Sequence, residues 1–352
     1  METLSVKPEQ LLALSKAVFA AQGLADDHAT TVAEGLVKAN LRGVDSHGVA
    51  RIPMYLHRLR EGVINKTPQL KARSVTPAVS LVDGDNGMGF VVGRYAMNEA
   101  IRLAADIGIG LVGVRNSGHF GMSAVYVLQA LEAGLISFVY TNSSPAMPVW
   151  GGRSKFLGAS PFAAGAPGGE SEYLLDMACT ITARGKLKYA AQRGEAIPEG
   201  LALDSEGKPT TDGEAAFHGT VLPFGEAKGA ALAMLMDILC GVLTGAAFAG
   251  DVKNPYTDTS GPQNVGHFFV ALKPDLFVSQ HEYESRMDTL IRRAKSGPLA
   301  NGFDEILIPG EPETRAQKER LKNGIPLSAD VVEHLRAELE ACSLNWDDFL
   351  SS

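Results

Sequence analysis

The sequence has few cysteines, and their placement excludes two classes of site. Only Cys179, Cys240 and Cys342 occur in 352 residues, and none stands in a Cys-x-x-Cys pair. Such scattered thiols form neither a disulfide framework nor a cysteine-ligated metal centre. Histidine pairs with zinc-site spacing, His-x-x-x-His or His-Glu-x-x-His, are also missing. We therefore expect no bound metal and a reducing, cytoplasmic setting.

Basic residues are outnumbered, and no long uninterrupted apolar run occurs. The 32 Lys and Arg against 40 Asp and Glu give a net charge of −8, which argues against a broad nucleic-acid surface. Residues 1–10 contain charges and lack the apolar core of a signal peptide. The longest apolar run, residues 229–250, contains Asp237 and several glycines. It predicts a buried, closely packed helical segment rather than a membrane span.

The usual dinucleotide-binding fingerprint occurs once, but not between a strand and a helix as that function requires. Residues 108–113 match G-x-G-x-x-G, but here a helix is expected before the glycines and a strand after them. A Rossmann unit has the reverse order. We interpret the segment as a helix C-cap followed by a strand of small residues. Gly87-Met88-Gly89 with Gly93 is better placed, but its spacing is wrong for the fingerprint.

Helical patterns mark both ends of the chain, and short strands alternate with helices between them. Proline near the first turn and glycine after the last predict terminal helices beginning near Pro8, Asp26 and Pro53. The alternation predicts an α/β layer architecture. We expect a helical domain formed by residues 1–72 together with 284–352, and an α/β domain of residues 73–283. The predicted inner elements are helices 90–107 and 122–133 and strands 78–82, 109–114, 135–140, 173–182 and 265–272.

Two glycine-flanked histidine motifs carry the strongest chemical signal. One is the segment 45–51, DSHGVAR, and the other is 116–121, NSGHFG. Imidazole exchanges protons near pH 7, and the planar fork of arginine matches a carboxylate. His119 follows an expected strand and precedes an expected helix, where ligands bind in open α/β sheets. We therefore predict His119, His47 and Arg51 as catalytic residues, while a loop-turning histidine and a surface arginine are the structural alternatives.

Two further positions suit a bound anion or hydroxyl ligand. Lys228 stands at the start of a long apolar helix, and a helix N-terminus together with a lysine suits a phosphate. Ser143-Ser144-Pro145 follows a strand end and offers hydroxyl groups. A lysine at a polar helix end and an ordinary Ser-Pro turn explain these residues equally well.

The chain resembles the malate/L-lactate dehydrogenase family of NAD(P)-dependent oxidoreductases, which is distinct from the Rossmann-type lactate and malate dehydrogenases. The resemblance runs nearly end to end. Each matching piece is weak, but their ordered series is specific. The pieces are residues 42–48 (RGVDSHG), 83–87 (DGDNG), 116–121 (NSGHFG), 176–178 (DMA), 183–186 (ARGK), 209–212 (PTTD), 228–229 (KG) and 309–311 (PGE).

The resemblance implies a fold, a cofactor site and a partner. The fold would be α/β, with a non-Rossmann mixed-sheet cofactor domain and a helical domain formed from both termini. His119 would be the acid–base group, with His47 and Arg51 in the substrate pocket. Members are generally homodimers. The positions matching NAD- or NADP-contacting residues are Ser143, Asp176, Met177, Ala178, Lys228, Pro309, Gly310 and Glu311.

The implied reaction is hydride transfer between nicotinamide C4 and C2 of a small 2-oxo or 2-hydroxy acid. The family also includes ureidoglycolate, sulfolactate and diketogulonate enzymes, and reductases of cyclic 2-imino acids (piperideine- or pyrroline-2-carboxylate), which are the alternative. A non-catalytic carboxylate-binding protein and a cofactor-free acid–base lyase are candidates of other classes. Residues 226–227 (EA) and 230–231 (AA) depart from the family pattern around Lys228. The sequence therefore does not determine which acid is the substrate, and it does not indicate whether the cofactor is NAD or NADP.

Overall fold

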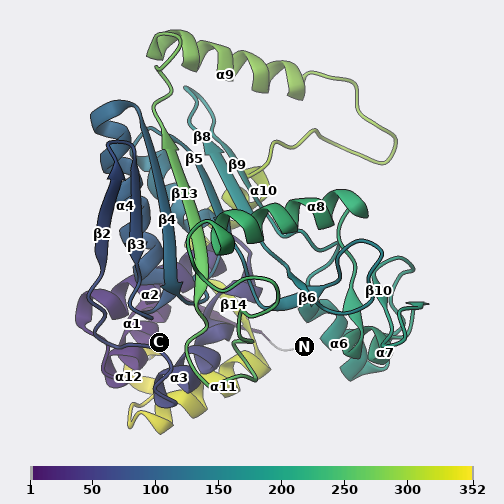
Figure 1. Ribbon diagram of the computed structural model, residues 1–352. Coiled ribbons are helices and arrows are strands. Elements are labelled where there is room, and N and C mark those ends of the chain that lie inside the picture. The colour runs from purple at the N-terminus through teal and green to yellow at the C-terminus, as the bar shows by residue number, and fades with distance from the viewer. Residues whose placement is uncertain (1–2, 351–352) are drawn as a thin grey trace.

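The computed structural model describes residues 3–350, so residues 1–2 and 351–352 of the predicted helical domain lie outside the described part. The two ends of the chain meet in a small sheet. Strand β1 (Thr3–Val6) pairs antiparallel with β14 (Ile325–Ser328), so that Val6 lies opposite Ile325. This pairing fixes the first and last helices against each other (Figure 1).

The terminal helices share one apolar core. Leu11, Leu14 and Val18 recur at spacings of three and four residues along α1 and are fully buried, as expected for one face of an amphipathic helix. Leu335 and Leu339 of the C-terminal α11 join the same core. The helices expected near Pro8, Asp26 and Pro53 are confirmed. The helices of this part are α1 (Pro8–Ala21), α2 (Asp26–Leu41), α3 (Ile52–Arg60), α11 (Ala329–Ala341) and α12 (Asp347–Leu350).

The central sheet has seven strands in the order β2-β3-β4-β13-β5-β8-β9. Only β3 and β4 run parallel, and the other neighbours pair antiparallel. A Rossmann sheet is mostly parallel, so the expected mixed, non-Rossmann sheet is confirmed. The strands are β2 (Lys71–Thr76), β3 (Val79–Asp83), β4 (Ile109–Ser117), β5 (Ile136–Thr141), β8 (Phe162–Ala166), β9 (Tyr173–Met177) and β13 (Val265–Leu272).

Helices cover both faces of this sheet. On one face lie α4 (Gly89–Ile107) and α5 (Ala124–Glu132), and on the other lie α8 (Ala227–Asp237) and the π-helical turn η3 (Ile238–Val242). Gly108 ends α4 in the left-handed conformation, with a φ of +93°, and β4 follows directly. The G-x-G-x-x-G segment is therefore a helix C-cap and a strand, as interpreted from the sequence.

The apolar run 229–250 differs from its prediction. It forms α8 and η3, as a helical segment should, but it is not buried on all sides. One face packs on the sheet, while large apolar side chains on the other face are exposed, because no other element of the described chain covers them. These exposed side chains are Met234, Leu235, Ile238, Val242 and Leu243.

Short elements beyond the sheet form a small lobe. Its core includes Met147, Leu157, Leu187 and Ala202, and it joins α8 through Ala230. The elements are β6 (Pro145–Met147), β7 (Leu157–Gly158), α6 (Arg184–Arg193), β10 (Ala202–Leu203), β11 (Pro209–Thr210), α7 (Gly213–His218) and β12 (Thr220–Val221).

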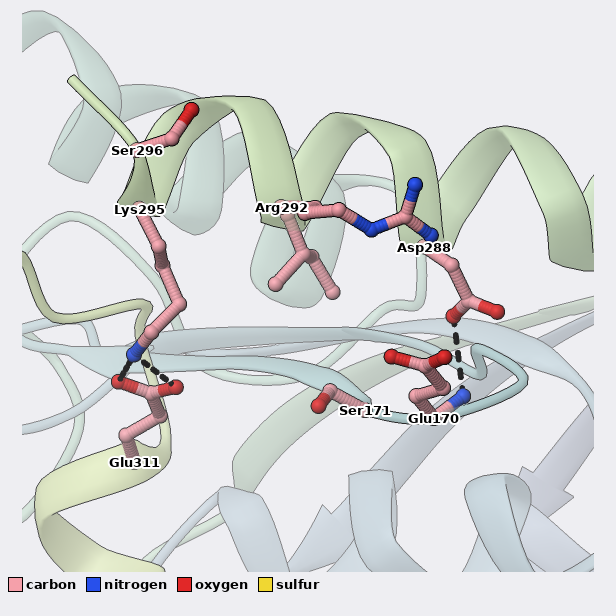
Figure 2. Close-up of a pocket in the computed structure, with 8 residues that line it drawn as sticks. Glu170, Ser171, Asp288, Arg292, Lys295, Ser296 and Glu311 are labelled. Carbon is pink, nitrogen blue, oxygen red and sulfur yellow. Dashed lines mark hydrogen bonds and ion pairs between the residues drawn. The ribbon is translucent and has the colours of Figure 1, made fainter.

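Helix α9 (Gln280–Lys295) lies apart from the terminal helices, over the β8–β9 turn (Figure 1). The Asp288 carboxylate accepts hydrogen bonds from the backbone N–H groups of Gly169 and Glu170. Lys295, at the other end of α9, is paired with Glu311 at the start of α10 (Glu311–Asn323). Between these anchors lies a depression of about 410 Å³ (Figure 2).

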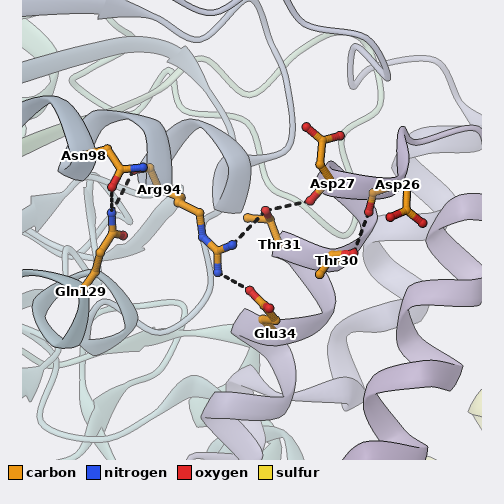
Figure 3. Close-up of polar contacts among 8 residues, drawn as sticks. All are labelled: Asp26, Asp27, Thr30, Thr31, Glu34, Arg94, Asn98 and Gln129. Carbon is orange, nitrogen blue, oxygen red and sulfur yellow. Dashed lines mark hydrogen bonds and ion pairs between the residues drawn. The ribbon is translucent and has the colours of Figure 1, made fainter. Parts of the chain in front are cut away.

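A second depression, of about 650 Å³, lies between the helical part and the helices of the sheet. Arg94 of α4 donates to Thr31 and Glu34 of α2 at its rim, and Gln129 of α5 donates to Asn98 (Figure 3). Neither depression is lined by His47 or His119. Within residues 3–350, no helix is long and apolar enough to cross a membrane, and no cluster of three or more metal-ligating side chains occurs.

Candidate active site

The fold brings the two histidine motifs together. The rings of His47 and His119 are stacked, with centroids 5.9 Å apart and planes 17° from parallel. His47 ends a short 3-10 turn before α3, whereas His119 lies in the loop between β4 and α5. Tyr55 of α3 completes the cluster, with its ring centre 5.9 Å from that of His119.

The first motif is held by the end of α2 and by the C-terminal part of the chain. Asn40 donates to the carboxylate of Asp45 at 2.7 Å and accepts from the N–H of Val49 at 2.8 Å. Arg320 of α10 also donates to both carboxylate oxygens of Asp45, at 2.6 and 3.0 Å. A Cβ at Gly48 would lie 2.1 Å from the Asn40 side-chain oxygen. Glycine is therefore required here, because the motif bends tightly around Asn40.

The second motif is fixed from both sides of its loop. Gln263, just before β13, accepts the N–H of His119 at 3.1 Å. Behind the loop, the buried ring of His267 contacts Ser117 and Thr141 at 2.8 Å each. The same ring stacks on Phe120, with centroids 4.4 Å apart and planes 4° from parallel. His119 is thus carried by a loop that is tied to three strands.

The imidazole of His119 has one engaged nitrogen. Its Nδ1 lies 2.5 Å from the hydroxyl oxygen of Tyr55, and the backbone nitrogen of Gly121 lies 3.4 Å from the same ring nitrogen. Nε2 makes no hydrogen bond within the described chain. A hydroxyl both donates and accepts, so Tyr55 can stay bonded to Nδ1 whether the ring is neutral or protonated. Nε2 is therefore the nitrogen available for proton exchange with a ligand.

Burial and a nearby cation keep both rings neutral. Burial, together with the positive charge of Arg51, lowers the pKa of His47 to about 4. Burial also holds the pKa of His119 well below its usual value of 6.5, again with Arg51 as the second cause. At pH 7 both rings are therefore uncharged, and a ligand that brings negative charge to Arg51 would raise both pKa values.

Arg51 lies beside the histidines with part of its guanidinium free. Its Nε donates to the backbone oxygen of Ser46 at 2.6 Å, and its Cζ lies 5.3 Å from the ring centre of Tyr256. The two terminal amino groups have no hydrogen-bond partner, and no carboxylate pairs with Arg51, among residues 3–350. Such a fork suits a ligand carboxylate.

The predicted cofactor residues gather along the edge strand β9. At one end, the N–H of Leu174 donates to the carbonyl of Pro309 at 3.1 Å, and Gly310 packs against Leu174. The Glu311 carboxylate is occupied by Lys295 at 2.6 Å and by the N–H of Ile308 at 3.1 Å. The side chain of Glu311 therefore stabilises its own turn in this structure.

Asp176 connects this strand to the His119 loop. Its carboxylate accepts the N–H of Ala124, the first residue of α5, at 2.7 Å. The surrounding protein removes enough water to raise the pKa of Asp176 to about 7, although one side of the side chain is exposed to solvent. Since α5 begins five residues after His119, Asp176 marks the point where β9 approaches the histidine cluster.

Beyond β9, Lys228 and Ser143 are also close to this strand. Cys179, next to Ala178, accepts the N–H of Phe224, and Gly229 packs against both of these residues. Lys228, in the first turn of α8, is exposed, and its ammonium group has no partner in the described chain. The hydroxyl of Ser143 accepts the N–H of Ser160 at 3.3 Å, and Ser160 lies beside Cys179. Residues from four distant segments thus line one edge of the sheet.

The groups left unpartnered here fit a ligand that carries hydroxyl and phosphate groups. The hydroxyls of Ser123 and Ser160 are buried without hydrogen-bond partners, and such groups are costly unless a ligand or water satisfies them. Lys228 supplies a cation at a helix start, where anions are favoured. These groups fit a nicotinamide dinucleotide, which carries both ribose hydroxyls and phosphates.

Sequence reasoning missed four residues of the cluster: Tyr55, Gln263, Tyr256 and His267. Tyr55 had only the pattern of an apolar helix position, and Gln263 and Tyr256 lie in the polar stretch 251–264, whose sequence contains no motif. His267 had no neighbour in sequence to suggest a role, because its partners Ser117 and Thr141 lie 150 and 126 residues away.

We expect His267 to make stability depend on pH. Burial lowers its pKa from 6.5 to about 3, so between these values the unfolded ring takes up a proton that the folded ring refuses. The free energy of unfolding should therefore decrease as the pH is lowered through this window. The decrease approaches about 1.4 kcal/mol per pH unit for one such group. The stability advantage of wild type over His267→Gln in denaturant unfolding should be about 1.6 kcal/mol smaller at pH 5 than at pH 6.5. An unchanged difference would exclude this role.

Comparison with known proteins gives one consistent result. The model of a family described as malate/L-lactate dehydrogenase matches residues 6–336. The L-sulfolactate dehydrogenase of Methanocaldococcus jannaschii is 37% identical over 348 residues, which cover 98% of this chain and 99% of that protein. The malate dehydrogenase of Pyrococcus abyssi is 38% identical over 338 residues, covering 94% and 92%.

Solved structures agree with the sequence matches. The structure of sulfolactate dehydrogenase from Methanocaldococcus jannaschii superposes with a TM-score of 0.92 at 36% identity. The match covers 98% of this chain and 99% of that one. The similarity therefore extends over the terminal helices, the mixed sheet and the small lobe alike.

Proposed function

The chain belongs to the malate/L-lactate dehydrogenase family and is an oxidoreductase, and we propose that the His47–His119 cluster is its active site. The protein uses a nicotinamide cofactor, NAD or NADP, and acts on small 2-hydroxy or 2-oxo acids. The single observation that supports this site is the stacked histidine pair beside an unpaired arginine. It combines proton exchange with carboxylate binding in one place.

In this proposal, His119 exchanges the proton at the substrate oxygen through Nε2. Tyr55 holds Nδ1, so the ring keeps its orientation as the proton moves. Arg51 binds the substrate carboxylate, which offsets its charge and removes one cause of the low His119 pKa. When Nδ1–H of the neutral ring donates to the Tyr55 oxygen, Nε2 carries no proton and can accept one from a hydroxy acid. With a bound oxo acid, the same ring takes up a proton and then donates it.

The nicotinamide, when bound, supplies or accepts the hydride at C2 of the substrate. We propose that the residues along β9 hold this cofactor: Ser143, Asp176, Met177, Ala178, Lys228, Pro309, Gly310 and Glu311. Asp176 lies where this strand reaches the His119 loop. This hydrogen bond between β9 and the start of α5 supports a cofactor site close to the proposed acid–base group.

A substrate screen tests the function. Loss of reduced-nicotinamide absorbance would be followed with NADH and NADPH and a panel of 2-oxo acids that includes oxaloacetate, pyruvate and sulfopyruvate. Oxidation of the corresponding hydroxy acids and of ureidoglycolate would be followed in reverse. Turnover of at least one of these acids is expected. Consumption of piperideine-2-carboxylate alone would instead make the protein a cyclic-imine reductase.

We also propose that the protein is a homodimer. The exposed apolar side chains of α8 and η3 lie on one helical face, and a contiguous apolar surface of this kind marks an interface. Light scattering should give twice the chain mass. Replacing Leu235 and Ile238 with aspartate should produce monomers, whereas Val75→Asp on the exposed strand β2 should not. A monomeric wild type would refute the proposal.

A further inference from the structure

A loop of residues 251–264, here named the covering loop, lies against the histidine cluster. It leads into β13, and its last part is tied to the His119 loop. Gln263 accepts the N–H of His119 and donates to the carbonyl of Lys253 at 3.0 Å, which joins the two ends of the covering loop. Lys253 in turn donates to Ser260 at 2.9 Å. The loop is therefore internally bonded rather than an open connection.

A buried arginine fastens the covering loop to α3. Arg58 is 1% exposed and donates to the carbonyls of Asp258 at 2.7 Å and Gly261 at 3.3 Å. A long cationic side chain is rarely buried so completely unless it fulfils a specific contact. Arg58 follows Arg51 by seven residues on the same rigid segment, since α3 begins at Ile52. The covering loop thus has a fixed position relative to Arg51.

This attachment places one aromatic ring over the guanidinium of Arg51. The Tyr256 ring centre lies 5.3 Å from Cζ of Arg51, within the range of a cation–π contact. No carboxylate of the described chain pairs with Arg51, and burial lowers the pKa of this arginine. The electron-rich ring face and the carbonyl of Ser46 are the two contacts that compensate this half-buried cation.

We propose that Tyr256 is a positioning residue that holds Arg51 in its substrate-binding orientation. The ring covers one face of the guanidinium while Ser46 accepts its Nε–H. These two contacts leave only the terminal amino groups open. The covering loop, fixed by Arg58 and Gln263, is the frame that carries the ring. This inference rests on the proposed role of Arg51 as the carboxylate clamp.

Steady-state kinetics with the best 2-oxo acid separate positioning from folding. Tyr256→Leu should raise KM about tenfold, which equals 1.4 kcal/mol and lies within the range of cation–π contacts. kcat at saturation should change far less, because the proton donor is untouched. Tyr256→Phe keeps the ring and should behave like wild type. Tyr95→Leu, a half-exposed tyrosine on α4, is the matched control.

A double-mutant cycle tests whether Tyr256 acts through Arg51. Arg51→Lys keeps the charge but loses the planar fork, so it should raise KM by itself. Adding Tyr256→Leu to Arg51→Lys should then have little further effect, because the two changes remove one coupled arrangement. Full additivity of the two KM effects, or an unchanged KM in Tyr256→Leu, would overturn the proposal.

Chemical modification gives a measurement that needs no substrate. Phenylglyoxal reacts with accessible guanidinium groups, and mass spectrometry of peptides locates the product. Arg51 should react faster in Tyr256→Leu than in wild type or Tyr256→Phe, while the buried Arg58 should stay protected in all three. Equal Arg51 rates would refute the ring's role. If no acid is turned over by wild type but the rates differ, the proposed function fails while the positioning contact stands.

Discussion

Replacing His119 with alanine is expected to lower kcat by at least about a hundredfold, the usual effect of losing a general acid–base group. The structure leaves Nε2 of His119 as the free nitrogen, since Nδ1 is engaged by Tyr55 and Gly121. His47 is held in a similar way, with the Ser46 hydroxyl 3.0 Å from its Nδ1, which makes it the second candidate. Single-turnover measurements at saturating substrate would report the chemical step directly. Affinity for the reduced cofactor should change little, because the proposed cofactor residues lie along β9.

Two variants sharpen this prediction. Tyr55→Phe removes the hydroxyl but keeps the ring, so it should slow the same step by a smaller factor and shift its pH dependence. His281→Ala, an exposed histidine on α9, should leave the rate unchanged. If His119→Ala turned over near the wild-type rate, His119 would have no part in proton transfer, and His47 would become the candidate.

The sequence could indicate the histidines but not the contacts that orient them. His47 and His119 stand out because glycines and small polar residues surround each of them, and such motifs are local. Tyr55 lies only four residues beyond Arg51, yet its partner is 64 residues away. No periodicity or motif reports such a contact, since it is created by the packing of α3 on the β4–α5 loop.

The fold shows the same division between local and distant causes. Helices with clear apolar faces, and strand β13, were predicted closely, because their patterns are long and regular. Strand β8, with the sequence FAAGA, was missed because small residues give little strand signal. Strand β9 was predicted to reach Thr182 but ends at Met177, where the chain leaves the sheet toward Cys179.

The domain boundaries were not determined by these patterns. The division into residues 1–72 with 284–352 and residues 73–283 stays a prediction. The pairing of β1 with β14 links the two ends, while α9 is anchored on the β8–β9 turn by Asp288. Both contacts join segments more than a hundred residues apart. The hydrophobic periodicity within either segment therefore cannot predict them.

The second large effect is expected at the cofactor site. Lys228→Ala should weaken binding of the reduced cofactor by about 1.5–3 kcal/mol, the scale of a lost hydrogen bond to a charged group. The ammonium group of Lys228 has no partner within residues 3–350, and it stands at the start of α8, where a phosphate is favoured. Isothermal titration with NADH and with NADPH would measure the loss. The fold itself should be unaffected, because the side chain is exposed.

Two controls decide between this site and a glycine-loop site. Lys71→Ala removes an exposed lysine from β2, at the opposite edge of the sheet from β9, and should leave affinity unchanged. Gly108→Ala places a side chain at a φ of +93° in the helix cap, so it should reduce stability. The folded protein should still bind cofactor normally. If Gly108→Ala lost cofactor binding while Lys228→Ala bound normally, the G-x-G-x-x-G segment would be the pyrophosphate-binding site. The distributed site along β9 would then be wrong, because a single loop would supply the donors that we assign to four separate segments.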